Sequence, residues 1–147
     1  MSRKSKEEIA EIYSQIQDYV CTQLEIADGT GQFMEDKWER SAGGGGRTRI
    51  FKNGEIIEKG GVAFSAVHGA TPDKILKKLN LDKTDFFATG VSIVLHPKSP
   101  MVPIIHMNIR YFEMDNGEYW FGGGIDLTPH YVDKADAKYF HQEIKKV

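Results

Sequence analysis

The chain has 147 residues, of which 40% are hydrophobic and 27% are charged, and its formal net charge is -2. This length allows one buried core but is short for two domains, so a single globular unit is expected. The small net charge provides no global field that would attract nucleic acid, and the composition therefore favours a site for a small molecule.

The first predicted element is an N-terminal helix. Ser5 and Glu8 have the spacing of a capping box. Apolar residues then recur at every third or fourth position and mark one face of a helix: Ile9, Ile12, Ile16, Val20 and Leu24. Gly29 and Gly31 follow this stripe and indicate that the helix stops there.

The next segment predicts an antiparallel meander. Strands are expected at residues 33–40, 47–51, 56–59 and 62–68. Asn53 and Gly54 form the strongest short signal for a hairpin. The glycine run at residues 43–46 is expected to form a loop, because glycine loses more backbone freedom than other residues when it enters regular structure.

The second half predicts a short helix, further strands and a last helix. Thr71 and Pro72 supply an N-cap and a first-turn proline for a helix through Leu79. Strands are expected at residues 91–96, 104–114 and 119–121, and a helix at residues 133–147. A second glycine run, residues 122–124, is expected to leave Asp126 on a tight turn. The fold class is therefore α+β, built on an antiparallel sheet.

The longest predicted strand alternates between polar and apolar residues. Because side chains alternate across a strand, His106, Asn108 and Arg110 share one face. Ser92 and His96 alternate in the same way on the preceding strand. If the loop between the two strands leaves both polar sets on the same side of the sheet, these five residues form one polar floor. We expect this floor to face a cleft roofed by the second glycine run. An ordinary solvent face would also fit the pattern, but such faces favour Lys, Glu and Thr.

Neither glycine run fits a nucleotide-binding motif. The first lacks the Lys-Ser or Lys-Thr pair of a phosphate loop, and the second lacks the spacing of a dinucleotide fingerprint. We interpret the second run as a place where the backbone approaches a flat ligand and Asp126 projects toward it. An Asx-turn, or a cap of Asp126 onto Thr128, is an equally open interpretation of this aspartate.

Three histidines are candidate metal ligands, because imidazole is the commonest donor to transition metals: His96, His106 and His141. Their spacing includes no helical histidine pair, and no cysteine cluster accompanies them. Taken singly, each is more simply interpreted as a hydrogen-bonded core or surface residue.

The composition also bears on location. Cys21 is the single cysteine, which excludes an internal disulfide and fits a reducing compartment. The first eight residues are charged, unlike a secretory signal. The longest apolar stretch, residues 86–95, is interrupted by polar residues and is shorter than the ~20 residues of a membrane span. A soluble cytoplasmic protein without a membrane span is expected.

Distinctive segments occur along the whole chain from the first helix onward: residues 33–40, 43–47, 61–69, 90–92, 96–97, 102–103, 106, 108, 110–112, 120–124 and 126–129. The most specific is the aromatic-flanked triple glycine that leads into Asp126-Leu127-Thr128-Pro129. In this order, the segments resemble the oxygen-dependent coproporphyrinogen III oxidases.

The resemblance implies a large, curved antiparallel sheet flanked by helices, and a homodimer. It implies that residues 1–147 are the N-terminal part of a single domain, since family members continue beyond Val147, and that the truncated chain alone is not a competent oxidase. The implied reaction is the oxidative decarboxylation of two propionates of coproporphyrinogen III to vinyl groups, giving protoporphyrinogen IX in haem biosynthesis. Oxygen is the implied co-substrate, and no organic cofactor or haem is implied.

The resemblance also implies roles for particular residues. The implied catalytic residues are His106 as proton donor, with Asp126 and Arg110 in substrate orientation and catalysis. The implied substrate contacts are Ser92, Asn108, Ile109 and Arg110. The same comparison implies that His96, His106 and His141 could hold a divalent metal cation. From the chemistry of the substrate, Arg110 suits a carboxylate clamp and Asp126 could accept hydrogen bonds from pyrrole N–H groups.

Two alternatives remain open on the sequence. The first is a non-catalytic fragment that binds a tetrapyrrole, which predicts porphyrinogen binding without oxygen consumption. The second is a histidine-ligated metal oxygenase with an unrelated small substrate. It is supported only by the three histidines and Asp126, and metal analysis would distinguish it from a metal-free enzyme.

Overall fold

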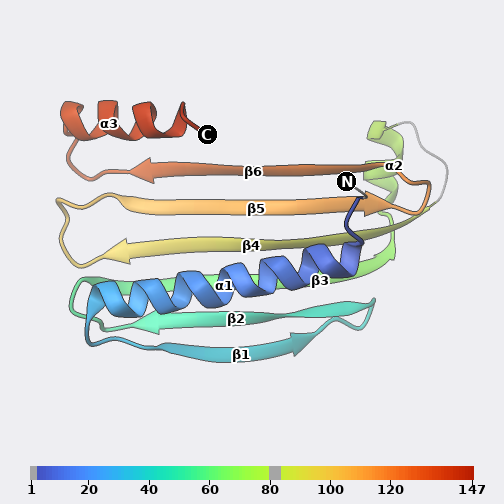
Figure 1. The fold of residues 1–147 in the computed structure, drawn as a ribbon, viewed down its shortest axis with the longest axis horizontal. Helices are drawn as coiled ribbons and strands as arrows, with labels where there is room; N and C mark the ends of the chain where they lie inside the picture. Colours follow the sequence, from blue (N-terminus) through green and yellow to red (C-terminus); the bar gives the residue numbers. More distant parts are fainter. Residues whose placement is uncertain (1–2, 80–83) are drawn as a thin grey trace.

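The computed structural model describes residues 3–79 and 84–147. In this part of the chain, six strands form one antiparallel sheet in which each strand pairs with its neighbours in sequence. The elements are α1 (Lys6–Asp28), β1 (Phe33–Glu39), β2 (Gly44–Lys52), β3 (Ile57–Ala70), α2 (Asp73–Leu79), β4 (Asp85–Pro97), β5 (Ile104–Met114), β6 (Tyr119–Thr128) and α3 (Lys134–Ile144). Figure 1 shows α1 across one face of the sheet and α3 beyond the β6 edge. The α+β prediction is confirmed.

Helix α1 begins and ends as its sequence predicts. The Ser5 N–H donates to Glu8 Oε2 at 2.7 Å, and the Glu8 N–H donates to Ser5 Oγ at 3.2 Å. At the other end, Gly29 adopts the left-handed conformation with φ 85°, and its N–H donates to the Glu25 carbonyl. These caps satisfy backbone groups that a helix leaves without partners at its ends.

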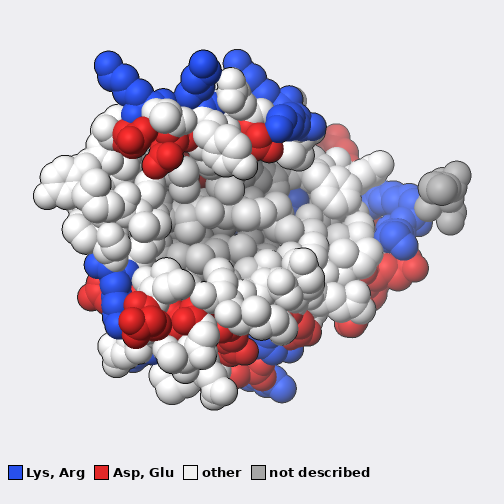
Figure 2. All heavy atoms as spheres, turned by 60° about the vertical axis from the view of Figure 1, so that its left-hand side comes forward, with Lys and Arg blue, Asp and Glu red and all other residues white. Residues whose placement is uncertain are grey.

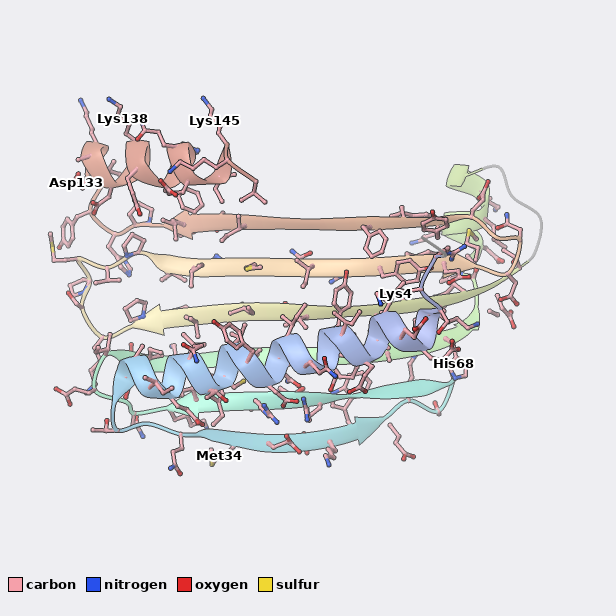
Figure 3. All side chains as sticks on the ribbon, in the orientation of Figure 1. Lys4, Met34, His68, Asp133, Lys138 and Lys145 are labelled. Atoms are coloured by element: carbon pink, nitrogen blue, oxygen red, sulfur yellow. The ribbon has the colours of Figure 1, made fainter. Side chains whose placement is uncertain are left out.

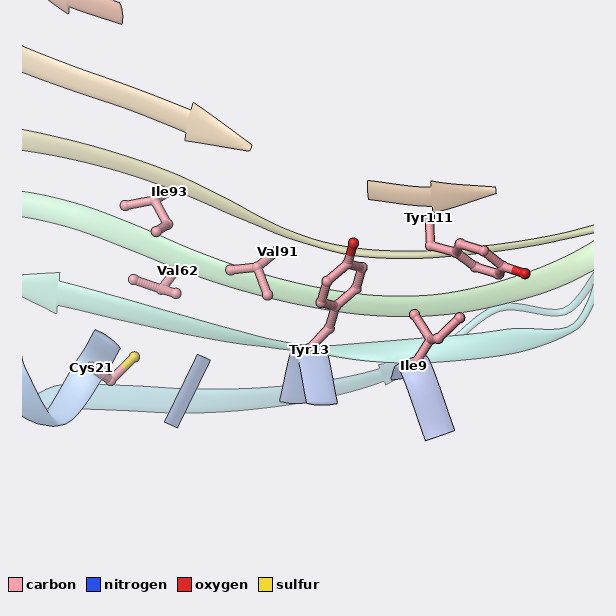
Figure 4. Close-up of a cluster of buried hydrophobic side chains, with 7 residues drawn as sticks. All are labelled: Ile9, Tyr13, Cys21, Val62, Val91, Ile93 and Tyr111. Atoms are coloured by element: carbon pink, nitrogen blue, oxygen red, sulfur yellow. The ribbon is translucent and has the colours of Figure 1, made fainter. Parts of the chain in front are cut away.

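The hydrophobic core lies between α1 and the middle of the sheet (Figure 4). Its buried side chains come from α1, β3, β4 and β5: Ile9, Tyr13, Cys21, Val62, Val91, Ile93 and Tyr111. The fully buried Gln17 joins the helix to this face, because its amide donates to the carbonyls of Arg47 and Val62. Since all of these side chains meet on one side, we call it the helix face of the sheet.

Arg47 and Arg49 also join α1 to the sheet. Arg47 Nη2 and Arg49 Nη2 each lie 2.7 Å from Asp18 Oδ1, and Arg49 Nη2 lies 2.9 Å from Glu35 Oε2. Burial lowers the pKa of the Arg49 guanidinium, but hydrogen bonds to Glu35 and Asp18 outweigh it and raise the pKa above its ordinary value. Both arginines are therefore internal cross-links, with side chains only 18–19% exposed.

Asp28 fixes the turn between β2 and β3. Its carboxylate is 5% exposed and accepts the backbone N–H groups of Glu55, Ile56 and Ile57, each at 2.9 Å. It also accepts the N–H of Gly31 at 2.9 Å. Burial raises the pKa of Asp28, but these backbone donors outweigh burial and hold the pKa well below its ordinary value.

This aspartate explains why the predicted hairpin turn is displaced. The Asn53 N–H bonds to the Glu58 carbonyl and the Gly54 N–H to the Ile57 carbonyl, so the turn reverses at residues 55 and 56. The predicted hairpin is confirmed, but the two residues at its tip are Glu55 and Ile56, whose N–H groups donate to the carboxylate of Asp28. Beyond the turn, the two strands expected at 56–59 and 62–68 form one continuous strand, β3.

The prediction that both glycine runs leave the sheet is wrong. Gly44 to Gly46 belong to β2, where they pair with residues 65–67 of β3. Gly122 to Gly124 belong to β6, where they pair with residues 108–110 of β5. In each case the strand continues past the glycines, and the paired neighbours satisfy the glycine backbone despite its entropic disadvantage.

Figure 2 shows a hollow at the centre of the surface in view where uncharged residues predominate, with charged side chains around its rim.

Helix α3 starts at the N-cap Asp133, and the side chains of Lys138 and of Lys145, just after the helix, project away from the sheet (Figure 3). None of the eleven residues of α3, all of them described, is buried. Within residues 3–79 and 84–147, no helix is long and apolar enough to cross a membrane.

Candidate active site

The register between β4 and β5 gathers the predicted polar residues on one face. Ser92 pairs directly with Asn108, Gly90 with Arg110, and Val94 with His106. Directly paired residues of an antiparallel sheet project to the same side. The intervening residues Val91 and Ile109 pack under α1, so the polar residues lie on the other side of the sheet, which we call the opposite face. The shared parity of the two strands is confirmed.

Strand β6 extends this face instead of roofing it. Gly122 pairs with Arg110, Gly124 with Asn108, and Asp126 with His106. The predicted cleft under a glycine loop is therefore wrong, and Asp126 projects from a strand, not from a tight turn. The physical reason is that β6 pairs with β5 over residues 119–128, which leaves no free loop at the glycines.

His106 and Asp126 form a hydrogen-bonded pair. The distance from His106 Nδ1 to Asp126 Oδ1 is 2.9 Å, and the Thr128 hydroxyl lies 3.4 Å from the same carboxylate oxygen. Both side chains remain accessible, at 42% and 65% exposed. Sequence reasoning missed this pair, because the two residues are twenty positions apart and only the β5–β6 register brings them together.

Arg110 differs from the arginines on the helix face. It is exposed, and within residues 3–79 and 84–147 it forms no ion pair. By contrast, Arg47 and Arg49 are both paired with Asp18. A guanidinium without an internal carboxylate partner, on the same face as Asn108 and His106, is available to bind a carboxylate from outside in a bidentate geometry.

Ile109 is the one predicted substrate contact whose side chain points the other way. It pairs with Val91 and Gly123 and packs against the core beneath α1. Strand alternation places it between Asn108 and Arg110 in sequence but on the helix face. The side chain of Ile109 therefore lies on the helix face, and its contact with the substrate stays a prediction.

The three candidate metal ligands do not converge. His96 and His106 lie on the opposite face, but His96 pairs with Lys59 whereas His106 pairs with Val94 and Asp126. His141 lies on α3, outside the sheet. In the described part of the chain, no three His, Cys, Asp or Glu side chains come together in a group that could hold a metal ion. The residues do not fit a three-histidine site, and the metal-oxygenase alternative loses its structural support.

An aromatic ladder borders the polar residues. The Phe112 ring stacks on Phe86 with centroids 5.4 Å apart and on Trp120 with centroids 4.6 Å apart. These rings come from β4, β5 and β6, one register step beyond Arg110 and Gly122. The sequence showed only consecutive aromatic residues, and the pairing of β4, β5 and β6 selected the three that stack on this face. The ladder provides a planar apolar surface beside the candidate carboxylate clamp.

The glycines of β6 leave the floor open. A Cβ atom added to Gly122 or Gly124 would meet nothing within 4 Å. The candidate active site is therefore an accessible floor on the opposite face, with His106 and Asp126 at one end and the aromatic ladder at the other. A separate groove of about 430 Å³ lies on the helix face beside α1 and is mainly apolar, with Tyr13, Met107 and Phe121 among its lining residues.

Comparisons with known proteins relate the chain to one protein family. The family model described as Coproporphyrinogen III oxidase matches residues 8–147. A protein of Prochlorococcus marinus strain NATL2A named oxygen-dependent coproporphyrinogen-III oxidase is 46% identical over 142 residues, which cover 95% of this chain and 40% of the relative. A protein of the same name from strain MIT 9312 is 47% identical over 146 residues, covering 98% and 42%. The chain thus spans about two fifths of the length of these curated relatives.

Proposed function

The chain belongs to the coproporphyrinogen III oxidase family, and on this premise we propose that the opposite face of its sheet is the substrate floor of an oxygen-dependent coproporphyrinogen III oxidase. The proposed reaction converts two propionates of coproporphyrinogen III to vinyl groups and yields protoporphyrinogen IX in haem biosynthesis. The observation that carries the proposal is the register that brings Ser92, Asn108, Arg110, His106 and Asp126 to one face.

The proposed substrate carries four propionates, so the enzyme must bind and orient anionic carboxylate groups. Arg110 is suited to bind a propionate, because its planar guanidinium matches the geometry of a carboxylate. No acidic side chain in the described part of the chain forms an ion pair with it. Ser92 and Asn108 are directly paired and add a hydroxyl and an amide to the same floor. We assign these side chains to substrate orientation.

The stoichiometry of the reaction requires a proton donor. When a propionate becomes a vinyl group, it loses carbon dioxide, one proton and two electrons. Reduction of oxygen consumes two protons for every two electrons, so one further proton for each vinyl group must come from the protein or solvent. His106 is suited to supply it, because imidazole changes its charge near neutral pH and its ring is accessible.

Oxygen is the proposed electron acceptor, and no organic cofactor is included in the proposal. Electrons come from the electron-rich, non-aromatic tetrapyrrole itself. No step is assigned to a metal, since the candidate histidines do not converge. From the family resemblance, we further propose that residues 1–147 are part of a single catalytic domain and that the complete enzyme is a cytoplasmic homodimer.

The test is an anaerobic-to-aerobic assay with coproporphyrinogen III. It would use this chain alone and a chimera in which the chain replaces its matched segment in the strain MIT 9312 relative. We expect the chimera to consume oxygen and to give a fluorescent protoporphyrin after product oxidation. Porphyrinogen binding by the chimera without oxygen consumption would instead support a non-catalytic tetrapyrrole-binding protein.

An Arg110→Lys variant of the chimera tests the clamp. A point-charge ammonium cannot reproduce the planar fork, so we expect KM to rise by about tenfold or more. Lys52→Arg is the matched control, because it exchanges the same two side chains on β2, away from β5 and β6. Unchanged substrate affinity in Arg110→Lys would exclude a bidentate contact.

A further inference from the structure

The hydrogen bond between His106 and Asp126 indicates a more specific role for the aspartate than contact with the substrate. We propose that Asp126 is a positioning residue for His106, which holds hydrogen on Nδ1 and thereby presents Nε2 to the ligand over the floor. The catalytic consequence rests on the proposed function, but the positioning itself is a property of this chain.

The geometry makes Nδ1 the hydrogen-bonded nitrogen. Asp126 Oδ1 lies 2.9 Å from His106 Nδ1, within ordinary hydrogen-bond distance. A carboxylate accepts hydrogen bonds, whereas an imidazole N–H donates them. The hydrogen between the two groups must therefore be on Nδ1. The hydrogen-bond partner of one ring nitrogen thus determines which of the two nitrogens carries the hydrogen.

Both members of the pair are held by strands. His106 and Asp126 occupy directly paired positions in β5 and β6, and they are not at the ends of either strand. Groups on paired strands are fixed more closely than groups on a loop. The Thr128 hydroxyl, 3.4 Å from Oδ1, lies on the same face and approaches the same oxygen. The aspartate is thus oriented from its own strand before any ligand binds.

The surroundings leave Nε2 accessible. On β6, the next position of the opposite face before Asp126 is Gly124, where an added Cβ would meet nothing within 4 Å. His106 is 42% exposed although Nδ1 is engaged. A ligand lying on the glycine side of the floor can therefore approach the ring without displacing a β6 side chain.

In the proposed reaction, the Nε2–H bond of the imidazolium breaks and its electron pair stays on Nε2. The proton is the one that oxygen reduction consumes for each vinyl group. The Nδ1–H bond to Asp126 is retained, so the neutral ring keeps its orientation and accepts the next proton from solvent at Nε2. Asp126 itself neither gains nor loses a proton.

The test begins with the tautomer of His106 in the 147-residue chain, independent of turnover. With ¹⁵N-labelled histidine at a pH where the rings are neutral, long-range ¹H–¹⁵N correlation distinguishes the protonated from the unprotonated ring nitrogen. We expect His106 to carry its hydrogen on Nδ1 and Asp126→Ala to shift it toward Nε2, the usual tautomer of free histidine. Asp36→Ala is the matched control, because Asp36 is an exposed aspartate on β1, remote from β5 and β6. A hydrogen on Nε2 in the unaltered chain would overturn the positioning role.

The second measurement uses steady-state kinetics of the chimera. Asp126→Asn should lower kcat by about 100-fold or more with little change in KM, because a carboxamide can also present its N–H₂ to Nδ1 and favour the wrong tautomer. Asp126→Glu should recover part of kcat, since it restores a carboxylate acceptor. A raised KM with unchanged kcat would show that Asp126 binds the substrate directly and would overturn the proposal. If the tautomer depends on Asp126 but the unaltered chimera shows no turnover, the positioning stands and the proposed function fails.

Discussion

The region around β2 and the region around β6 contain the same residue types for different reasons. In β2, a Cβ atom at Gly46 would lie 2.4 Å from both the Phe64 carbonyl oxygen and the Trp38 ring, so packing within the chain requires glycine. In β6, a Cβ atom at Gly122 or Gly124 would meet nothing within 4 Å. Glycine weakens a strand interior, and at Gly122 and Gly124 no contact within the described part of the chain accounts for it, whereas a Cβ at Gly123 would lie 2.4 Å from the Asn108 carbonyl oxygen.

The charged residues show the same contrast between the region around β2 and the region around β6. Asp28 and Arg49, near β2, are buried or largely buried and have several partners within the chain. Asp126 and Arg110, on β6 and β5, are exposed. The comparison teaches that composition alone does not separate structural from functional residues, and that the location of their partners does. Asp28 and Arg49 stabilise the fold, whereas Asp126 and Arg110, on the opposite face of β6 and β5, are accessible to a ligand.

The largest expected difference is between the two aspartates. Asp28→Ala leaves buried backbone N–H groups without acceptors, and we expect the midpoint of thermal unfolding to fall by about 10 °C. Asp126→Ala removes the same atoms from an exposed side chain and should change the midpoint by less than about 2 °C. Circular dichroism melts of the two variants provide the measurement. Equal losses would remove the distinction between the regions.

The low pKa of Asp28 predicts a dependence of stability on pH. Because its pKa is lower in the folded than in the unfolded state, the ionised carboxylate contributes stability above its unfolded pKa of about 4. This contribution should decrease as the pH falls from about 4 toward the folded pKa. Urea unfolding between pH 5 and 3, values chosen about the unfolded pKa, should show a smaller decline for Asp28→Asn than for the unaltered chain. The same slope in both proteins would contradict this assignment.

The two arginines should differ by an intermediate amount. Arg49→Ala removes one of two arginine partners from both Asp18 and Glu35 and should lower the free energy of unfolding by about 2–3 kcal/mol. Arg110→Ala should change it by less than about 0.5 kcal/mol, because the residue is exposed and no described acidic side chain pairs with it. Urea titrations can compare both values. A large loss for Arg110 would indicate a structural role on β5.

The smallest differences are expected for the glycines. Gly46→Ala should lower the free energy of unfolding by about 1–2 kcal/mol through overpacking against Phe64 and Trp38. Gly124→Ala should leave it unchanged or raise it by up to about 1 kcal/mol, because alanine has less backbone freedom to lose. In the chimera, the added methyl group should nevertheless raise KM for coproporphyrinogen III by about tenfold. Unchanged substrate affinity would show that the ligand does not approach β6 at Gly124.

Local sequence signals determined much of the fold. The capping box and apolar stripe located α1, and alternation within residues 104–114 assigned His106, Asn108 and Arg110 to one face. These predictions succeed because a helix cap and the alternation of a strand depend on residues close in sequence. The same alternation also placed the side chain of Ile109 on the other face.

Only the tertiary structure decided how the strands align. The Met114 N–H bonds to the Glu118 carbonyl, and Gly117 has φ 90°, so the turn between this bonded pair contains three residues, 115–117. A two-residue turn at Asn116 and Gly117 would shift the pairing by one position, oppose Asp126 to Met107 and place it on the helix face. Register is set by contacts along the whole pair of strands, and a shift of one residue moves every side chain to the other face. The sequence therefore determined which residues could form the site, while long-range pairing determined that His106 and Asp126 meet.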